Sequence, residues 1–266
     1  MAFSHHFLLH GMLAFSALHL ARLQPDRKAS LYADASAHHD AGLRLFRTAM
    51  MELSPQNCDA CFAYSSILVV YTWASSDQTG DLFFPDTSTA GRNISVGWAS
   101  LLRGVQTLLV TAAEWIGTGS MGIMLYPFTM ELELAMIANL EVTAKLTSLN
   151  QLWNSSPGKF SPANVEALNE TVALLLEAHG LLTSSSVEVQ VDTLSIALGW
   201  PIRVPEAFLA MVIELKPEAL VVLAHYSLLL NHVDHVWFMY GMSGHLLRSI
   251  HSRLGREWQS WISWLF

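Results

Sequence analysis

Apolar residues recur at intervals of three and four along most of the chain, and no segment shows the alternation typical of a β-strand. The segment that begins at Pro25 and Asp26 is one example. Its apolar side chains lie near one helical face, which consists of Leu31, Ala35, Gly42, Leu45, Ala49 and Leu53. The pattern predicts an all-α protein, a single bundle of about ten helices in which residues 1–266 form one domain.

Two serine-proline pairs mark further helix starts, because serine caps a helix and proline fits its first turn. Ser54-Pro55 predicts a helix that runs to about Ser75, with residues 67–73 deeply buried. Ser161-Pro162 predicts an amphipathic helix. Its apolar face consists of Val165, Leu168, Val172, Leu175, His179 and Leu182.

Glycines and polar clusters divide the middle of the chain. We expect one helix at residues 95–116 and another from about Thr129 to Trp153, because the glycines of 117–122 separate them. Loops are expected at residues 77–92, 155–162 and 184–186, which are rich in Ser, Thr, Gly, Pro and Asp.

The last third of the chain is the most apolar. A short helix is expected to end around Gly199, where Pro201 and Pro205 constrain the backbone, and nearly continuous helix follows. Residues 220–230 are apolar on every side apart from the segment His225-Tyr226-Ser227. This pattern predicts that they lie at the centre of the bundle.

Composition narrows the classes of function. Of the 266 residues, 52 % are hydrophobic and only 14 % are charged, and the net charge is −8. Without a basic stripe, we expect no direct binding to nucleic acid. The nearest candidate for a membrane span, residues 3–21, lacks formal charges but contains four histidines, and no basic residue precedes it, so we expect neither a membrane span nor a signal peptide.

Few residues are arranged for catalysis. His225, His232 and His235 would share one face of a single helix, which is one way to hold a metal, although a helix end and a core hydrogen bond also explain them. Cys58 and Cys61 have redox spacing, but no strand precedes them and two core thiols are expected. We therefore expect no enzyme and no cofactor, with a histidine-based metalloenzyme as the remaining catalytic alternative.

Large adaptable side chains suggest a binding site for an apolar ligand. Eleven methionines and nine tryptophans supply groups that line cavities, although the same residues also form ordinary cores. The best pocket candidate is residues 237–244, where two glycines beside large side chains would leave room along a helix. The candidate pocket residues are Trp237, Met239, Gly241, Met242 and Gly244.

Several motifs resemble one known family. They are the segment from His10 to Ala21, residues 32–46, Asn57-Cys58, and a set at Trp200, Pro201, Pro217, His225, Tyr226, Trp237, Gly241 and Gly244. Over nearly its whole length the chain is similar to the C-terminal effector domain of fungal zinc-cluster transcription factors of the sterol uptake control type.

The resemblance implies an α-helical regulatory domain that holds a sterol-like apolar molecule, in a protein of the nucleus or cytoplasm. It also implies protein partners or a homodimer. The DNA-binding zinc cluster of that family needs six cysteines, and this chain has two. We therefore expect no DNA-binding domain here. The alternative is a stand-alone helical protein that modulates full-length zinc-cluster factors without a ligand.

Overall fold

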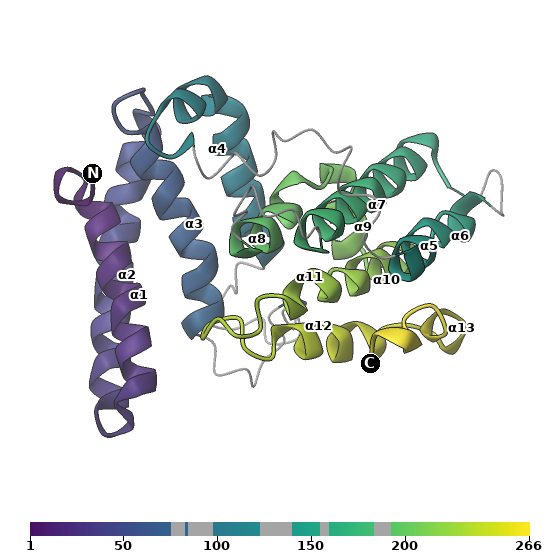
Figure 1. Cartoon of the computed structure of the whole chain (residues 1–266). Helices are drawn as coiled ribbons and strands as arrows, with labels where there is room; N and C mark the ends of the chain where they lie inside the picture. Colours follow the sequence, from purple (N-terminus) through teal and green to yellow (C-terminus); the bar gives the residue numbers. More distant parts are fainter. Residues whose placement is uncertain (76–82, 85–97, 123–139, 155–159, 184–192) are drawn as a thin grey trace. The chain divides into compact units, whose positions relative to one another are not determined.

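The computed structural model describes residues 1–75, 83–84, 98–122, 140–154, 160–183 and 193–266. All regular elements in these ranges are helices, which confirms the all-α, multi-helix fold (Figure 1). The chain divides into two compact units, Met1–Tyr126 and Pro127–Phe266, which are described separately. The assignment of all 266 residues to one domain stays a prediction.

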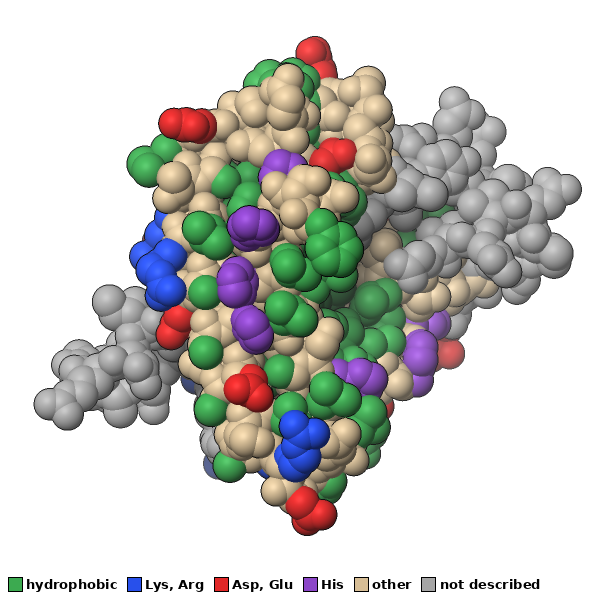
Figure 2. Space-filling model, turned by 90° about the vertical axis from the view of Figure 1, so that its left-hand side faces the viewer, with side chains coloured by type: hydrophobic (Ala, Val, Ile, Leu, Met, Phe, Trp, Pro, Cys, Tyr) green, Lys and Arg blue, Asp and Glu red, His purple; other side chains and the backbone are tan. Residues whose placement is uncertain are grey.

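The N-terminal unit is built on a helical hairpin. Helix α1 (His6–Leu23) packs along α2 (Lys28–Met51), and the short 3₁₀ turn Pro25–Arg27 joins them. Helix α3 (Cys58–Ser75) packs against α1, and α4 (Trp98–Thr118) packs against α3 (Figure 1). A column of histidine side chains, with apolar side chains beside it, runs down the outer face of this unit (Figure 2).

Tyr64 of α3 lies at the junction of α1, α2 and α3. Its side chain is fully buried and contacts the rings of Phe7 and Phe46, with centroids 5.6 and 4.7 Å away. Gly11 and Gly42 make room for it, because a Cβ at either position would come within 2.8 Å of Tyr64 atoms. Two glycines thus allow three helices to approach one aromatic side chain.

The expected face of α2 is only partly correct. Leu31, Ala35 and Gly42 are buried, but Leu45 is 44 % exposed, and the helix ends at Met51 before Leu53. The inward direction runs through Gly42 and Phe46, and Leu45 lies about 100° around the helix from Phe46.

Helix α3 begins three residues later than expected. The side-chain oxygen of Asn57 accepts a hydrogen bond from the backbone N–H of Ser54 at 2.8 Å, and its amide donates to the carbonyl of Glu52 at 3.1 Å. These bonds close a turn before the helix. The deep burial expected at residues 67–73 holds only for Val69 and Trp73, because most buried residues of α3 lie in its first half, from Cys58 to Ser65.

The C-terminal unit is arranged around α7 (Pro162–Thr183). The other helices of this unit are α5 (Leu140–Ser148), α6 (Gln151–Asn154), α8 (Thr193–Arg203), α9 (Glu206–Ile213), α10 (Pro217–His225), α11 (Ser227–Asn231), α12 (Met242–His251) and α13 (Arg256–Gln259). Helix α7 contacts α5 and α8 to α11, and α12 packs against α10 and α11. The hydroxyl of Ser161 accepts a hydrogen bond from the N–H of Asn164 at 3.2 Å, which confirms the predicted cap.

Residues 220–230 are buried almost throughout, as predicted for the centre of a bundle. The continuity of the last third is wrong, however, because α10 and α11 are separate helices and turns occupy residues 232–241. Helix α8 also continues past Gly199 through Pro201 to Arg203. The guanidinium of Arg203 donates two hydrogen bonds, at 2.8 and 3.0 Å, to the carboxylate of Glu177 and so anchors that last turn on α7.

Several sequence expectations lie outside the described residues. They are most of the loop at 77–92, the helix start near Thr129, most of the loop at 155–162, and the break at 184–186. The break at 117–122 lies inside, and α4 does end there, at Thr118.

Candidate functional site

The predicted pocket segment, residues 237–244, lies in the C-terminal unit and consists of the end of the turns after α11 and the first residues of α12. Met239 and Met242 are almost fully buried, with 0 and 1 % exposure, whereas Trp237 is half-buried. The ring of Trp237 meets that of Phe238 edge to face at 5.5 Å. The methionine sulfurs therefore belong to the interior of this unit, and Trp237 lies at its edge.

Gly241 has a backbone role that the sequence did not indicate. It lies outside the helix, as the residue before α12, and its φ of +77° is a left-handed conformation that favours glycine. Its N–H donates to the Asp234 carboxylate at 2.7 Å. Gly244 lies inside α12, where a Cβ would come within 3.1 Å of the Arg248 guanidinium. The assignment of both glycines to a pocket stays a prediction.

The C-terminal unit also contains a buried pair of aromatic rings. The rings of Trp200 and Tyr226 stack at 4.7 Å, and the Tyr226 hydroxyl donates to the carbonyl of Ala197 at 2.8 Å. His225 is fully buried, and its Nδ1 is 2.8 Å from the carbonyl oxygen of Val221. Burial lowers the pKa of His225 to about 4, so the imidazole is neutral at physiological pH.

Three buried polar atoms of this region have no hydrogen-bond partner in the described part of the chain. They are Trp200 Nε1, His225 Nε2 and Ser227 Oγ. Buried polar atoms are nearly always hydrogen-bonded to protein or to ordered water. The Ser243 hydroxyl donates to the carbonyl of Ser227 at 3.2 Å, which places Ser227 next to the start of α12.

Sequence reasoning placed none of these three residues in the apolar pocket and considered only His225, as a possible metal ligand. The signal was nonetheless present, because His225 and Ser227 interrupt the apolar segment 220–230. A separate depression on the surface of α7 is open and partly polar, and so it suits a bulky apolar ligand poorly. It is lined by Phe160, Pro162, Val165, Glu166, Asn169 and Glu170.

The three-histidine metal arrangement is not formed. His225 ends α10, His232 follows α11, and His235 lies in the turns beyond, so the single helix that would align them is broken. The described residues contain no group of three or more His, Cys, Asp and Glu side chains that could hold a metal ion.

The two cysteines are free and buried, as expected for core thiols. Burial raises the pKa of both Cys58 and Cys61, and that of Cys61 reaches about 11. Neither thiol is therefore appreciably ionised at neutral pH, and the thiolate that redox exchange requires is scarce.

Residues 1–111 match the model of the fungal specific transcription factor domain family. The chain is 25 % identical to sterol uptake control protein 2 of Saccharomyces cerevisiae over 258 residues, which are 91 % of this chain and 25 % of the yeast protein. It is 31 % identical to sterol uptake control protein 2 of Candida albicans over 115 residues, 43 % of this chain and 14 % of that protein. These similarities support a fungal transcription factor-type domain in this chain.

A third relative extends the similarity over 97 % of this chain. It is a Zn(2)-C6 fungal-type transcription factor of Gibberella zeae, 22 % identical over 272 residues, which are 52 % of that protein. The chain thus spans between 14 and 52 % of the length of these three relatives. The relatives support a role in the regulation of transcription. No solved structure matches the chain.

Within the described ranges, no single helix has the length and apolar character needed to cross a membrane, whereas α8 and α9 would together meet that criterion across a bend of 82°.

Proposed function

We propose that this chain is a regulatory domain of a fungal transcription regulator, and that its C-terminal unit binds an apolar small molecule such as a sterol or terpenoid. The proposal rests mainly on the similarity to sterol uptake control protein 2 of S. cerevisiae, which covers 91 % of the chain. The relatives are transcription factors, and so we propose no enzymatic activity.

Side-chain chemistry around α11 and α12 supports the choice of ligand class. Met239 and Met242 are flexible apolar groups that adapt to a bulky ligand. Ser227 Oγ and His225 Nε2 need hydrogen-bond partners that an apolar core does not supply. An apolar ligand with a single hydroxyl group would bury a large apolar surface and bring one donor and acceptor to one of these two atoms, since side chains two residues apart on helical backbone point in different directions.

The regulatory mechanism would be a shift between two conformations. A ligand stabilises the conformer that it binds only by the difference between its affinities for the two conformers. Occupation of the C-terminal unit would therefore change which surfaces are exposed to a protein partner or to the transport machinery. The protein would act in the nucleus or move there from the cytoplasm.

The test uses a fluorescent sterol that accepts excitation energy from tryptophan, titrated into the full chain. We expect saturable binding to the native protein and binding at least tenfold weaker for Met239→Gln, because a buried amide replaces an apolar thioether. The matched control is Met51→Gln, a methionine that is 79 % exposed on α2, and it should bind like the native protein. Circular dichroism establishes that both variants are folded.

Two results would refute the proposal. One is no saturable binding of the native chain to the sterol or to a terpenoid probe. The other is equal binding by folded Met239→Gln and Met51→Gln. Either result, together with co-purification of a full-length zinc-cluster protein, would favour the stand-alone interaction protein.

A further inference from the structure

Helix α1 packs inside the N-terminal unit through a regular seam. Its buried residues Phe7, Gly11, Ala14, Leu18 and Ala21 are spaced by four, three, four and three positions. This average period of 3.5 residues is the spacing with which one α-helix packs lengthwise on another. The seam is occupied, because α2 and α3 pack against α1.

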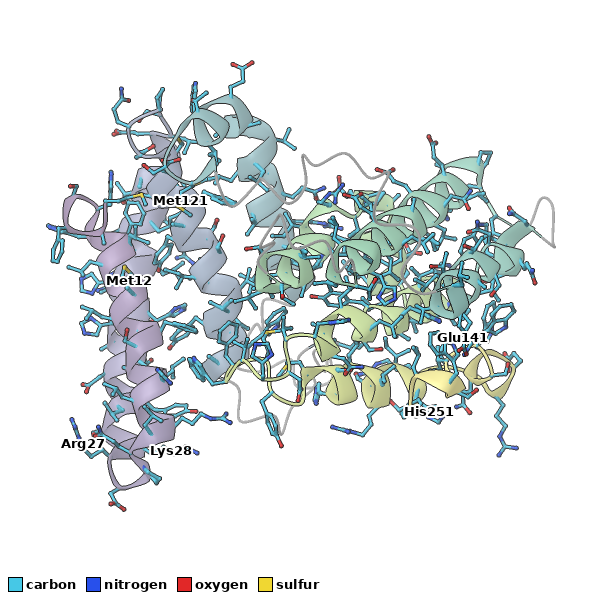
Figure 3. All side chains as sticks on the ribbon, viewed as in Figure 1. Met12, Arg27, Lys28, Met121, Glu141 and His251 are labelled. Carbon is cyan, nitrogen blue, oxygen red and sulfur yellow. The ribbon has the colours of Figure 1, made fainter. Side chains whose placement is uncertain are left out.

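A second seam of the same period follows two residues later, about 200° around the helix. It consists of Leu9, Leu13, Ser16, Leu20 and Leu23, again spaced by four, three, four and three. Leu13, Leu20 and Leu23 are 42, 41 and 63 % exposed, and Met12, labelled in Figure 3, is 47 % exposed beside them.

Period and charge together indicate what covers the exposed seam. A period of 3.5 suits another α-helix. Helix α1 carries one formally charged residue, Arg22, in its 18 residues. Helix pairs between different chains are usually selected by opposite charges beside the seam, and identical helices are kept apart by like charges. Neither device is present along Leu9–Leu23, and so an identical helix meets no electrostatic barrier.

The order of side chains is symmetric about Ser16. Leu9 and Leu23 lie seven residues before and after it, Met12 and Leu20 four residues, and Leu13 and His19 three residues. A two-fold axis through Ser16 would thus place a large side chain opposite each leucine. A self-complementary patch of this kind is what a two-fold symmetric dimer requires. The small side chain of Ser16 lets the two helices approach closely at the axis.

We propose that two copies of this chain dimerise through α1, with the two helices antiparallel and Ser16 on the two-fold axis. Leu9 of one copy packs on Leu23 of the other, and Met12 packs on Leu20. The seam from Leu9 to Leu23 is about 21 Å long. It is narrow compared with a standard interface of about 800 Å² per partner, so the dimer dissociates on dilution. This proposal goes beyond ligand binding and does not depend on it.

The first test is the mass of the full chain by analytical ultracentrifugation over a range of concentrations. We expect the native chain to shift from 29.5 kDa toward twice that mass as concentration rises. Leu20→Glu should remain monomeric, because two carboxylates would enter the apolar contact. Leu45→Glu is the matched control, since Leu45 is 44 % exposed on α2 and outside the seam, and it should dimerise normally.

The second test is disulfide cross-linking, which the buried native Cys58 and Cys61 do not disturb. Ser16→Cys should form a covalent dimer on mild oxidation, whereas Ser36→Cys, exposed on α2, should not. A mixture of Leu9→Cys and Leu23→Cys chains should cross-link between the two variants, and neither should cross-link with itself.

Three results would overturn the proposal. They are a native chain that is monomeric at every concentration, a dimer that Leu20→Glu leaves intact, and a Leu9→Cys chain that cross-links with itself, which would mean parallel helices.

Discussion

The junction at Tyr64 makes a quantitative prediction about the N-terminal unit. A Cβ on Gly42 would lie 2.7 Å from the Tyr64 hydroxyl oxygen, 3.1 Å from its ring carbon Cε2 and 3.2 Å from His10 Cβ. The same hydroxyl is buried and has no hydrogen-bond partner in the described residues. Gly42→Ala therefore places a methyl group against the hydroxyl oxygen of Tyr64, and Tyr64→Phe removes that oxygen.

The expected energies follow from two opposing effects. Gly42→Ala should gain about 1 kcal/mol of helix propensity but lose about 2–3 kcal/mol from overpacking against the hydroxyl. The net result is a free energy of unfolding lower by about 1–2 kcal/mol. Tyr64→Phe removes an unpartnered hydroxyl and should stabilise the protein by about 1 kcal/mol. In the double variant the closest clash is gone, so we expect a favourable coupling of about 1–2 kcal/mol.

Urea unfolding followed by circular dichroism measures the native protein, both single variants and the double variant. Gly104→Ala on α4 is the control, because a Cβ there meets no described atom within 4 Å and should give the propensity gain alone. The reasoning is refuted if Gly42→Ala stabilises as much as Gly104→Ala. It is also refuted if the effect of Gly42→Ala is the same with Tyr64 and with Phe at position 64.

Three further predictions concern the C-terminal unit. Arg203→Met should lower the free energy of unfolding by about 3 kcal/mol, since it leaves the Glu177 carboxylate buried without its partner. In urea unfolding, adding Glu177→Met to the same chain should restore most of this loss. An Arg203→Met variant with the free energy of unfolding of the native protein would contradict the prediction. The folded-state pKa of His225, about 4, lies below the ordinary value of 6.5. Between these two pH values the unfolded chain therefore binds more protons than the folded chain. The free energy of unfolding should fall as the pH drops from 6.5 to 4, by up to about 3 kcal/mol. Urea midpoints measured across that pH range should show this fall, and His225→Gln should reduce it; an identical profile in both proteins would argue against the assignment. Gly241→Asp should strain a left-handed backbone position and place a second carboxylate beside Asp234. We therefore expect this variant to bind the fluorescent sterol more weakly than Gly241→Ala does. Unchanged binding of every apolar ligand tested would show that residue 241 is not part of the pocket.

Local signals predicted the elements well where one side chain or one period decides the structure. The Ser161-Pro162 pair starts α7 because a hydroxyl cap and a proline act within a single turn. Residues 220–230 are buried because a segment that is apolar on all sides has no face for water. The exposure of Leu45 could not be predicted, since Leu45 fits the apolar spacing of α2 as well as Gly42 does. It is exposed because Phe46 takes the inward position.

The assignment of residues 237–244 to a ligand site stays a prediction. The composition indicated large adaptable side chains at residues 237–244, and Met239 and Met242 are indeed interior. The role of Gly241 was missed, because a positive φ and a bond to Asp234 depend on how the turn folds back. The unpartnered atoms of Trp200 and Ser227 depend on which carbonyls and hydroxyls reach them, and sequence spacing does not report that.

The sequence by itself determined that this chain is helical, poor in charge and related to fungal regulators, because period, composition and motif are properties of neighbouring residues. Tertiary structure alone decided which of two equivalent seams on α1 is buried. The seam of Phe7 and Leu18 faces α2 and α3, and the seam of Leu13 and Leu20 faces outward, although both have the same spacing. Periodicity defines the apolar faces of a helix, and only the packing of other helices determines which face they cover.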